Sequence, residues 1–370
     1  MSRPLQARID LAAIQHNFRL ARAYADSARV LAVIKANAYG HGAAPVARAL
    51  ATEANAFGVA CAEEALELRD SGIRAPILLL EGPFAAAELD LIDQARLMTV
   101  VHDARQLDWV LQARPRHPLC VWLKIDTGMH RLGMTGEEGR AAHARLAACP
   151  QVGELVLMTH FARADEADTA PTDHQMADFA RLLASIPAGT PPARSLANSA
   201  AILTRPDTHA DWIRPGIMLY GLDPLEHPHP RAAALRPAMS LTSQLTAVRD
   251  LGPGEAIGYG GRFVCQRPTR VGVVAGGYAD GYPRHAPDGT PVAVNGQLTC
   301  LIGRVSMDML TVDLSNQPQA RPGDPVELWG TQISANAVAA ASGTISYELL
   351  TGLSRRVPLR YQPSDVANAD

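Results

Sequence analysis

The chain is 370 residues long, 47% hydrophobic and 19% charged, with a formal net charge of −3. The length predicts two domains, and the weak net charge offers no basic surface for nucleic acid or an anionic membrane. No apolar run reaches the roughly 20 residues that cross a bilayer. The N-terminus carries Arg3, Arg8 and Asp10 where an export signal has an apolar core, so we expect no signal peptide.

The cysteine pattern excludes two further classes of protein. The five cysteines are odd in number, widely spaced and never in a C-x-x-C pair: Cys61, Cys120, Cys149, Cys265 and Cys300. A disulfide framework or a zinc site needs paired or closely spaced cysteines. We therefore expect reduced thiols, a cytoplasmic protein and no bound metal.

The first 220 residues alternate between helical periodicity and short apolar runs. Asp10 predicts the N-cap of a first helix whose apolar stripe includes Leu11, Ile14 and Phe18. Helical spacing returns in later segments, among them 62–70, 136–148 and 172–186. Between such segments lie eight apolar runs, at 30–34, 57–61, 77–81, 97–101, 119–126, 155–160, 194–198 and 213–220.

This alternation predicts the fold class. Strands that alternate with helices imply right-handed crossovers and a parallel sheet, and eight such units predict a (β/α)8 barrel of the TIM type. A doubly wound open sheet is the alternative, but no G-x-G-x-x-G follows the first run. Barrel active sites lie at the carboxyl ends of the strands. Polar residues end or interrupt five of the runs: Lys35, Lys124 with Asp126, His160, Asn198 with Ser199, and Arg214.

Lys35 ends the first run, RVLAVIK, and a polar, glycine-punctuated loop follows it and leads into an alanine-rich helix. An amine at the end of a buried strand is partly desolvated, which lowers its pKa and makes it a better nucleophile towards an aldehyde. The alternative is a lysine whose stem lies along the strand end while its ammonium reaches solvent.

The last third of the chain has a different texture. A Pro/His-rich segment, 223–237, predicts a linker between two domains, 1–230 and 231–370, with the first few residues of the chain able to pack on the second. Short apolar runs with Gly/Pro turns predict a mostly-β domain, and Asn295-Gly296 predicts a type I′ hairpin. The runs are 239–251, 270–275, 291–294, 298–303, 309–314 and 325–329, with short helices expected at 334–341 and 347–353.

Nine motifs, in order along nearly the whole chain, resemble those of the pyridoxal-phosphate-dependent alanine racemases, a family with a barrel and a β domain. The motifs are AVIKANAYGHG (32–42), LKIDTGMHRLGM (123–134), MTHFARADE (158–166), LANSAA (196–201), RPGIMLYG (214–221), IGYGGRF (257–263), GYADGYPR (277–284), GRVSMDM (303–309) and SYE (346–348). The resemblance implies interconversion of L- and D-alanine, which supplies D-alanine for peptidoglycan or serves alanine catabolism.

The resemblance implies that Lys35 holds pyridoxal phosphate as a Schiff base, for which an amine is the residue type required. Racemisation removes the α-proton from one face and returns it on the other, so it needs a second acid/base group. By the resemblance this group is Tyr259, with His160 as its hydrogen-bond partner, and Lys35 serves D-alanine while Tyr259 serves L-alanine. A phenol with a pKa of about 10 needs a cationic neighbour to act as a base at neutral pH. In isolation, Tyr259 would be a surface-turn tyrosine and His160 a strand-end core histidine.

Further residues of the site follow from the same resemblance. Arg214 would face the pyridine nitrogen, which a guanidinium cannot protonate, so that side reactions such as transamination are held down. Alone, Arg214 would be an arginine paired with Asp207 or Asp211. The cofactor phosphate would be bound by Tyr39, Ser199, Tyr347 and the backbone N–H groups of Gly216 and Ile217. Ser199 is also a candidate N-cap for the helix that follows it.

The substrate carboxylate would be met by Arg131, whose fork matches two oxygens, and by the N–H of Met307. In several family members the lysine matching Lys124 carries a carbamate that positions the arginine, and we expect the same modification here. The alternative is a surface pair of Lys124 with Asp126. One position departs from the pattern, because Ser195 stands where some members place a histidine behind the cofactor-facing arginine.

The same resemblance implies that the functional protein is an obligate head-to-tail homodimer. Lys35 belongs to the barrel and Tyr259 to the second domain, and in the family the two meet across the interface, so the tyrosine comes from the partner subunit. Tyr278, Asp280 and Tyr282 would line the entry passage.

Three rival functions remain at this stage. A serine or broad-specificity racemase of this fold differs only in its pocket lining. A decarboxylase would need an acidic group where Arg214 stands, and a non-catalytic pyridoxal-phosphate carrier would lack the second domain.

Overall fold

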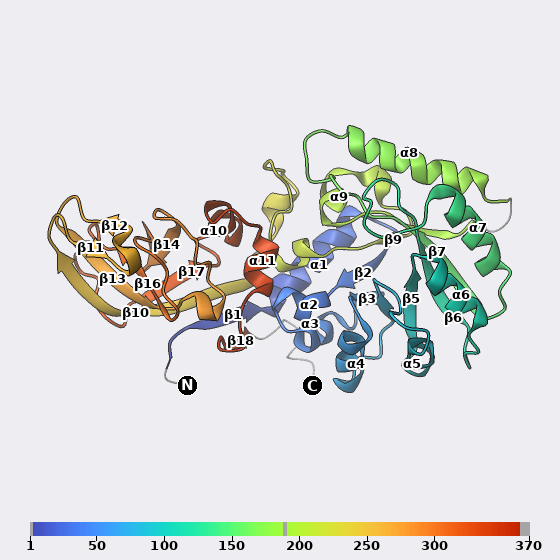
Figure 1. Cartoon of the computed structure of the whole chain (residues 1–370), viewed down its shortest axis with the longest axis horizontal. Coiled ribbons are helices and arrows are strands. Elements are labelled where there is room, and N and C mark those ends of the chain that lie inside the picture. The colour runs from blue at the N-terminus through green and yellow to red at the C-terminus, as the bar shows by residue number, and fades with distance from the viewer. Residues whose placement is uncertain (1–2, 188–190, 363–370) are drawn as a thin grey trace.

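The protein, described by a computed structural model over residues 3–187 and 191–362, has a barrel domain and a β domain that lie side by side (Figure 1). In the described residues eight parallel strands close the barrel in chain order, and the last pairs with the first. The predicted (β/α)8 barrel is therefore confirmed. The strands are β2 (Arg29–Val33), β3 (Ala56–Val59), β4 (Ile77–Leu79), β5 (Leu97–Val101), β6 (Leu119–Lys124), β7 (Val152–Met158), β8 (Ala193–Ser195) and β9 (Trp212–Ile213).

The eighth run, 213–220, is strand only at its start. β9 ends at Ile213, and the rest of the run contains the 3-10 helix η2 (Ile217–Tyr220). Pro215 has no N–H to donate to a strand ladder, and Gly216 directs its own N–H to the Ser199 hydroxyl at 2.9 Å. The prediction of a long eighth strand is wrong because these two residues turn the chain across the mouth of the barrel.

Helices cover the outside of the barrel (Figure 1). Asp10 caps the first of them as predicted, since its Oδ1 accepts from Ala13 N at 2.9 Å. Thr135 and Glu138 form a capping box at the start of α7. The helices are α1 (Leu11–Tyr24), α3 (Ala43–Leu50), α4 (Ala62–Asp70), α5 (Glu88–Gln94), α6 (Ala104–Gln112), α7 (Gly136–Ala147), α8 (Ala170–Ser185) and α9 (Ser199–Thr204).

The second domain is mostly β, as expected. Asn295 and Gly296 have φ angles of 51° and 77°, and they join two antiparallel strands, which confirms the predicted hairpin. The strands are β10 (Met239–Leu251), β13 (Thr269–Ala275), β14 (Pro291–Val294), β15 (Gln297–Cys300), β16 (Met309–Asp313) and β17 (Pro325–Trp329), with the helices α10 (Ala335–Ala341) and α11 (Ser346–Thr351).

Four short strands were not predicted. β1 (Gln6–Asp10) precedes the barrel in sequence but pairs antiparallel with β10 and parallel with β18 (Leu359–Gln362) of the second domain. The two-residue strands β11 (Ala256–Ile257) and β12 (Phe263–Val264) form a separate ribbon. These segments lack the apolar runs that marked the other strands, and each becomes a strand because a distant segment supplies its hydrogen bonds.

No helix in residues 3–187 and 191–362 is long and apolar enough to cross a membrane.

Asn17 fastens the first helix to the segment between the domains. Its side chain is fully buried, Nδ2 donates to Leu219 O at 3.0 Å and Arg236 O at 2.8 Å, and Oδ1 accepts from Arg236 N at 2.9 Å. Asn17→Ala removes all three bonds and leaves the buried carbonyl of Leu219 without this partner, so we expect it to lower the free energy of unfolding by about 3 kcal/mol.

The change is measured from denaturant midpoints. His16→Ala is the matched control, because His16 is on the same helix and its exposed ring nitrogen bonds Ala234 O, in the same segment, at 3.0 Å. This control should shift stability by less than about 0.5 kcal/mol. Equal losses in the two variants would contradict the role given to Asn17.

Candidate active site

Lys35 lies directly after β2 and begins the short element α2 (Lys35–Tyr39). The sequence predicts a loop here, but the residues from Ala36 to Tyr39 have φ angles of 51–53°, so the backbone makes a left-handed helical turn. Left-handed residues other than glycine cost about 1–2 kcal/mol each. The sequence pattern missed this turn because only Asn37 among its residues adopts the conformation readily.

Surrounding side chains hold the strained turn in place. Glu64 accepts from Ala36 N at 2.7 Å, and Nδ1 of His41 lies 3.0 Å from Ala38 O and 2.9 Å from Tyr39 O. His41 is fully buried, and this burial lowers its pKa to about 4. Its ring is therefore neutral at pH 7, with the Nδ1–H donating to the turn. Strain of this kind is kept at functional sites when neighbouring groups stabilise it.

Arg214 follows β9 and is buried beneath the carboxyl ends of the strands, 4% exposed. Its guanidinium donates to Ser195 Oγ at 2.6 Å, Thr159 O at 2.6 Å and Leu196 O at 3.1 Å, and its Nη2 lies 3.3 Å from His160 Nδ1. Ser195 thus lies behind Arg214, as expected from the sequence, and its hydroxyl accepts a hydrogen bond from the guanidinium.

The two carboxylates that could have neutralised Arg214 have other partners. Asp207 pairs with Arg205 at 2.8 Å and Asp211 with Arg194 at 3.3 Å. Burial lowers the pKa of Arg214 to about 10, which still leaves it charged at neutral pH. Arg214 is therefore a buried cation whose hydrogen bonds within the described residues all go to neutral acceptors. Such an arrangement is costly unless a ligand compensates it.

His160 follows β7 and completes this group. A guanidinium can only donate, so His160 Nδ1 accepts from Arg214 and the ring proton is on Nε2. Burial, together with the positive charges of Arg214, Lys124, Arg131 and Lys35, lowers the pKa of His160 well below its ordinary value. The imidazole is therefore neutral, and it lies among the basic side chains of the barrel mouth.

Lys124 is the last residue of β6 and is buried, 7% exposed. Its pKa falls to about 7 because of burial and the neighbouring Arg214, Arg131 and Lys35. In the described residues no ion pair joins Lys124 to a carboxylate, since Asp126 is bound to the ring and backbone of His130. The chain contains only two lysines, and both belong to this one site.

Five residues expected to bind phosphate lie around η2. Ser199 Oγ accepts from Gly216 N at 2.9 Å, and the rings of Tyr39 and Tyr347 have centroids 5.9 Å apart. Ile217 begins η2, so its N–H has no acceptor within the helix. A Cβ at Gly216 would lie 2.8 Å from Tyr39 Oη. This cradle of donors therefore has space only because residue 216 is a glycine.

Two sequence-predicted residues are far from this cluster. Tyr259 belongs to η4 (Tyr259–Gly261), between β11 and β12, and is 70% exposed. Figure 1 shows these strands at the end of the β domain remote from β2 and α2. Met307 also belongs to the β domain and is 51% exposed.

The three residues expected at an entry passage differ in exposure. Tyr278 is partly exposed, whereas Asp280 and Tyr282 are buried, and the ring of Tyr282 stacks on Trp329. The expectation that Asp280 and Tyr282 line a passage is wrong, because Asp280 is buried and bound by Arg3 and the core of the β domain encloses Tyr282.

The sequence analysis did not identify His102 or Thr159 as part of the site, and it offered the wrong residue as the N-cap of α9. His102, beside Lys124, follows the apolar run 97–101 just as Lys35 follows the first run, so the same rule would have found it. Thr159 acts through its backbone carbonyl, for which no residue-type signal exists. The N-cap of α9 is Asn198, which leaves the Ser199 hydroxyl free to face Gly216.

Within the part of the chain that the structure describes, no group of three or more His, Cys, Asp or Glu residues could hold a metal ion.

The comparisons with known proteins agree with this architecture. The family "Alanine racemase, N-terminal domain" matches residues 9–224, and "Alanine racemase, C-terminal domain" matches residues 238–361. An alanine racemase of Azoarcus sp. (strain BH72) is 55% identical over 97% of this chain and 99% of the relative. A catabolic alanine racemase of Pseudomonas aeruginosa is 54% identical over 97% and 99%. The crystal structure of the biosynthetic alanine racemase of P. aeruginosa superposes with a TM-score of 0.94, at 52% identity over 98% and 100% of the two chains.

The closed (β/α)8 barrel with an appended β domain is the architecture of the two-domain amino-acid racemases. More narrowly, the chain belongs to the alanine racemase family. It is an isomerase, and its activity is the interconversion of L- and D-alanine.

The neutral state of His41 has a consequence for the pH dependence of stability. The pKa of His41 is lowered from 6.5 to about 4 in the folded chain. The unfolded chain therefore binds a proton at this ring between these two values while the folded chain does not, so His41 makes stability fall as the pH drops from 6.5 to about 4. His41→Asn keeps an N–H donor without a titrating ring, and its loss of stability over this window should be shallower.

Denaturant titrations of the two proteins across the window measure the difference. Carboxylates that titrate in the same range are common to both proteins and cancel in it. Identical pH profiles would contradict the assignment.

Proposed function

We propose that this chain racemises alanine with pyridoxal phosphate bound at the mouth of the barrel. The observation that supports this most is the buried guanidinium of Arg214, which donates only to neutral acceptors and lies among the basic side chains of Lys35, Lys124 and Arg131. A phosphate and a substrate carboxylate supply the negative charge that such a site needs. Pyridoxal phosphate, when bound, is the electron sink that makes the α-proton of an attached amino acid acidic.

The residues present fit this cofactor. Tyr39, Ser199 and Tyr347 would hold the phosphate with the N–H groups of Gly216 and Ile217, in the space that a Cβ at Gly216 would fill. Burial raises the pKa of Tyr39 to about 12, so its phenol stays protonated and can donate a hydrogen bond to an anion. Late loops of (β/α)8 barrels commonly bind phosphate in this way.

Arg214 would face the pyridine nitrogen. The guanidinium is charged, donates only, and pairs with no carboxylate in the described part of the chain. Such a group hydrogen-bonds an unprotonated nitrogen without protonating it, which favours simple return of the α-proton. An acidic residue in this place, as a decarboxylase would require, is absent from the described contacts of Arg214.

Two bases on opposite faces would exchange the α-proton. The Lys35 amine accepts it from D-alanine and donates it on the reverse reaction, and the partner subunit's Tyr259 does the same for L-alanine. A phenol has a pKa of about 10 and is a weak base unless its anion is stabilised. His160 supports that anion as a neutral donor through Nε2–H, and the positive charge comes from Arg214 behind it. The cationic neighbour that the phenol needs is therefore Arg214, which acts through the neutral ring of His160.

A head-to-tail homodimer would bring these two bases together. The ribbon that carries Tyr259 is remote from Lys35 within one chain (Figure 1), and the exposed ring of Tyr259 has free surface for a second subunit to cover. The barrel mouth of one subunit then faces the β domain of the other. Arg131 and the N–H of Met307 would meet the carboxylate of alanine in this shared site.

Lys124 would carry a carbamate. Its pKa of about 7 leaves a large neutral fraction, and the neutral amine adds to CO2 to give the carbamate anion and one proton. The product anion lies among Arg131, Arg214 and Lys35, which stabilise it. A charge-assisted bond from Arg131 to the carbamate would fix the arginine for the substrate.

The cellular role is either peptidoglycan supply or alanine catabolism, since a catabolic relative is 54% identical and a biosynthetic one 52% identical to this chain. The free state of all five cysteines, each in the described part of the chain, supports a cytoplasmic enzyme. The match to the C-terminal domain family speaks against a lone-barrel carrier, and the relatives named above are alanine racemases.

A mixed dimer tests the shared site. Lys35→Ala and Tyr259→Phe should each lose racemisation almost completely, because each removes one of the two bases. Coexpression with two different affinity tags yields a heterodimer in which one site keeps both Lys35 and Tyr259 and the other has neither. This heterodimer should show about half the turnover of the wild-type dimer.

The visible absorption of bound cofactor is the control. Tyr259→Phe should retain it and Lys35→Ala should lose it. Borohydride should attach the cofactor permanently to wild type and to Tyr259→Phe but not to Lys35→Ala. A heterodimer as inactive as both parents would contradict sharing of the site, and cofactor fixed to Lys35→Ala would contradict the assignment of the lysine.

The carbamate has a direct signature. Protein equilibrated with ¹³C-bicarbonate should show, apart from any signal of the N-terminal amine, one carbamate resonance by NMR that is absent from Lys124→Ala, since the chain has only the two lysines Lys35 and Lys124. Lys124→Ala should raise the KM for alanine by about tenfold, because Arg131 loses its anchor.

Lys35→Ala should keep the resonance. A signal that survives in Lys124→Ala, or no signal in wild type, would overturn the modification.

A further inference from the structure

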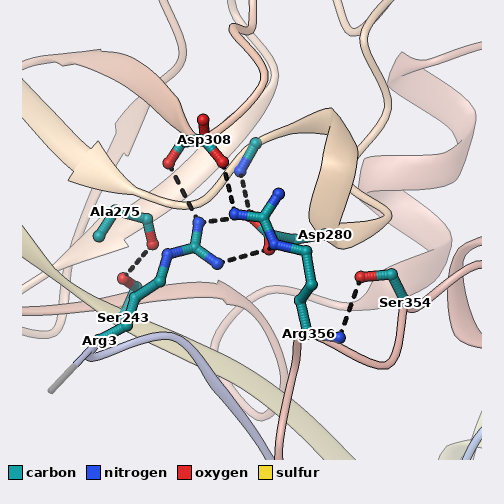
Figure 2. Close-up of polar contacts among 8 residues, drawn as sticks. Arg3, Ser243, Ala275, Asp280, Asp308, Ser354 and Arg356 are labelled. Carbon is teal, nitrogen blue, oxygen red and sulfur yellow. Dashed lines mark hydrogen bonds and ion pairs between the residues drawn. The ribbon is translucent and has the colours of Figure 1, made fainter. Parts of the chain in front are cut away.

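Four charged side chains from distant parts of the chain meet in the β domain (Figure 2). They are Arg3 near the N-terminus, Asp280 in η5 (Tyr278–Asp280), Asp308 just before β16, and Arg356 between α11 and β18. None of them is among the residues to which the proposed reaction gives a role. We call this group the Arg3–Asp280 cluster.

Asp280 is its centre. The carboxylate is 1% exposed and accepts hydrogen bonds from both terminal nitrogens of Arg3, at 2.5 and 2.6 Å. It also accepts from the Gly277 N–H at 2.9 Å, and Nε of Arg356 lies 3.5 Å away. Burial alone would raise the pKa of Asp280, but Arg3, Gly277 and Arg356 outweigh it and hold the pKa below its ordinary value. Two-pronged arginine–carboxylate bonds in such a setting are strong and geometrically specific.

The same two arginines hold the residue after Met307. Arg3 Nη2 also donates to the backbone oxygen of Asp308 at 3.2 Å, and Arg356 Nη2 donates to its carboxylate at 2.5 Å. The main chain and the side chain of Asp308 are therefore both tied to Asp280 through the arginines, as Figure 2 shows.

The backbones of η5 and the Met307 segment also pack directly on each other. Ala279 N donates to Met307 O at 3.0 Å, and Tyr278 N donates to Ser306 O at 3.0 Å. A Cβ at Gly277 would lie 2.3 Å from Ser306 O, so only glycine permits this approach. The carbonyl of Met307 thus has a fixed partner in η5.

The N–H of Met307 is different. No residue in the described part of the chain accepts a hydrogen bond from it, and the Met307 side chain is 51% exposed. The carbonyls of Ser306, Met307 and Asp308 all have partners within the described residues, but the Met307 N–H has none there. This N–H is therefore a donor that an external acceptor can use. Preorganised donors of this kind bind an anion without reorganisation.

We propose that the Arg3–Asp280 cluster is a positioning device that presents the Met307 N–H to the carboxylate of alanine in the partner subunit's site. The inference rests on the proposed contact between Met307 and the substrate. Arg3 and Arg356 are positioning residues, because they act on the substrate only through the backbone of the Met307 segment. The two ends of one chain thereby shape a site that the other chain uses.

The test compares Asp280→Asn and Arg3→Ala with the wild-type dimer. Asp280→Asn keeps the size of the side chain and an acceptor for Gly277 but removes the charge that orients both arginines. We expect the KM for alanine, and the inhibition constant of propionate as a carboxylate probe, to rise about tenfold. The cofactor absorption and the dimer should remain unchanged, and kcat should fall less than KM rises.

Asp250→Asn is the matched control. Asp250 pairs with Arg270 at 2.9 Å on the same domain, away from Met307, so its loss should leave the KM and the propionate constant unchanged. Arg3→Lys should show a smaller loss than Arg3→Ala, because an ammonium keeps the charge but cannot bridge both Asp280 oxygens.

Hydrogen exchange gives a readout that is independent of activity. In the ligand-free enzyme, peptides covering 303–309 should exchange faster in Asp280→Asn than in wild type, while peptides covering 291–300 should not change. Equal exchange at 303–309, an unchanged KM, or a KM that rises only in parallel with loss of cofactor or dimer would overturn the proposal. If Asp280→Asn does not fold, Arg356→Ala, whose side chain is partly exposed, carries the same test.

A separate variant distinguishes this inference from the function on which it rests. Met307→Pro removes the N–H itself. If Met307→Pro leaves the KM and the propionate constant unchanged, the substrate contact proposed for Met307 is wrong. If Met307→Pro raises both constants and Asp280→Asn raises neither, the contact stands and the positioning role of the cluster is wrong.

Discussion

The buried guanidinium of Arg214 is the constraint on which the rest of the site depends. Its hydrogen bonds go to carbonyls, a hydroxyl and a ring nitrogen, so its charge is uncompensated in the described chain. That charge dictates the tautomer of His160 and, with burial, lowers the pKa of Lys124 to about 7. A buried cation of this kind is costly without a compensating anion, and the hydrogen-bond donors proposed to bind the cofactor phosphate, Ser199 and Gly216, follow close to it in the fold.

The backbone after Lys35 is a second source of strain in the site. The left-handed turn after Lys35 occupies an unfavourable region over several residues, and it is kept there by Glu64 and by the buried His41. The turn places Lys35 on the rigid end of β2 while directing Tyr39 towards Gly216. Strain and buried charge thus occur together at one end of the barrel, and the remaining strands and helices form an ordinary, well-packed scaffold around them.

Sequence patterns predicted most of this scaffold because its signals are local. Apolar runs predicted the buried strands, Asp10 predicted a helix cap, and Asn295-Gly296 predicted a hairpin turn. In each case the physical cause lies within a few neighbouring residues. The long eighth strand failed where Pro215 removed a ladder donor. β1 and β18 were missed because their hydrogen bonds come from segments hundreds of residues apart in sequence.

The order of residue types along the chain by itself determined the barrel, the β domain, the family and the identity of the candidate residues, since amines, guanidiniums and hydroxyls at strand ends carry their chemistry with them. The tertiary structure alone decided how those groups act. It showed that Arg214 pairs with no carboxylate among the described residues, that His160 is neutral, that Lys35 begins a left-handed turn and that Arg3 reaches Asp280. These properties depend on burial and on contacts between distant segments, and neither is visible until the chain is folded.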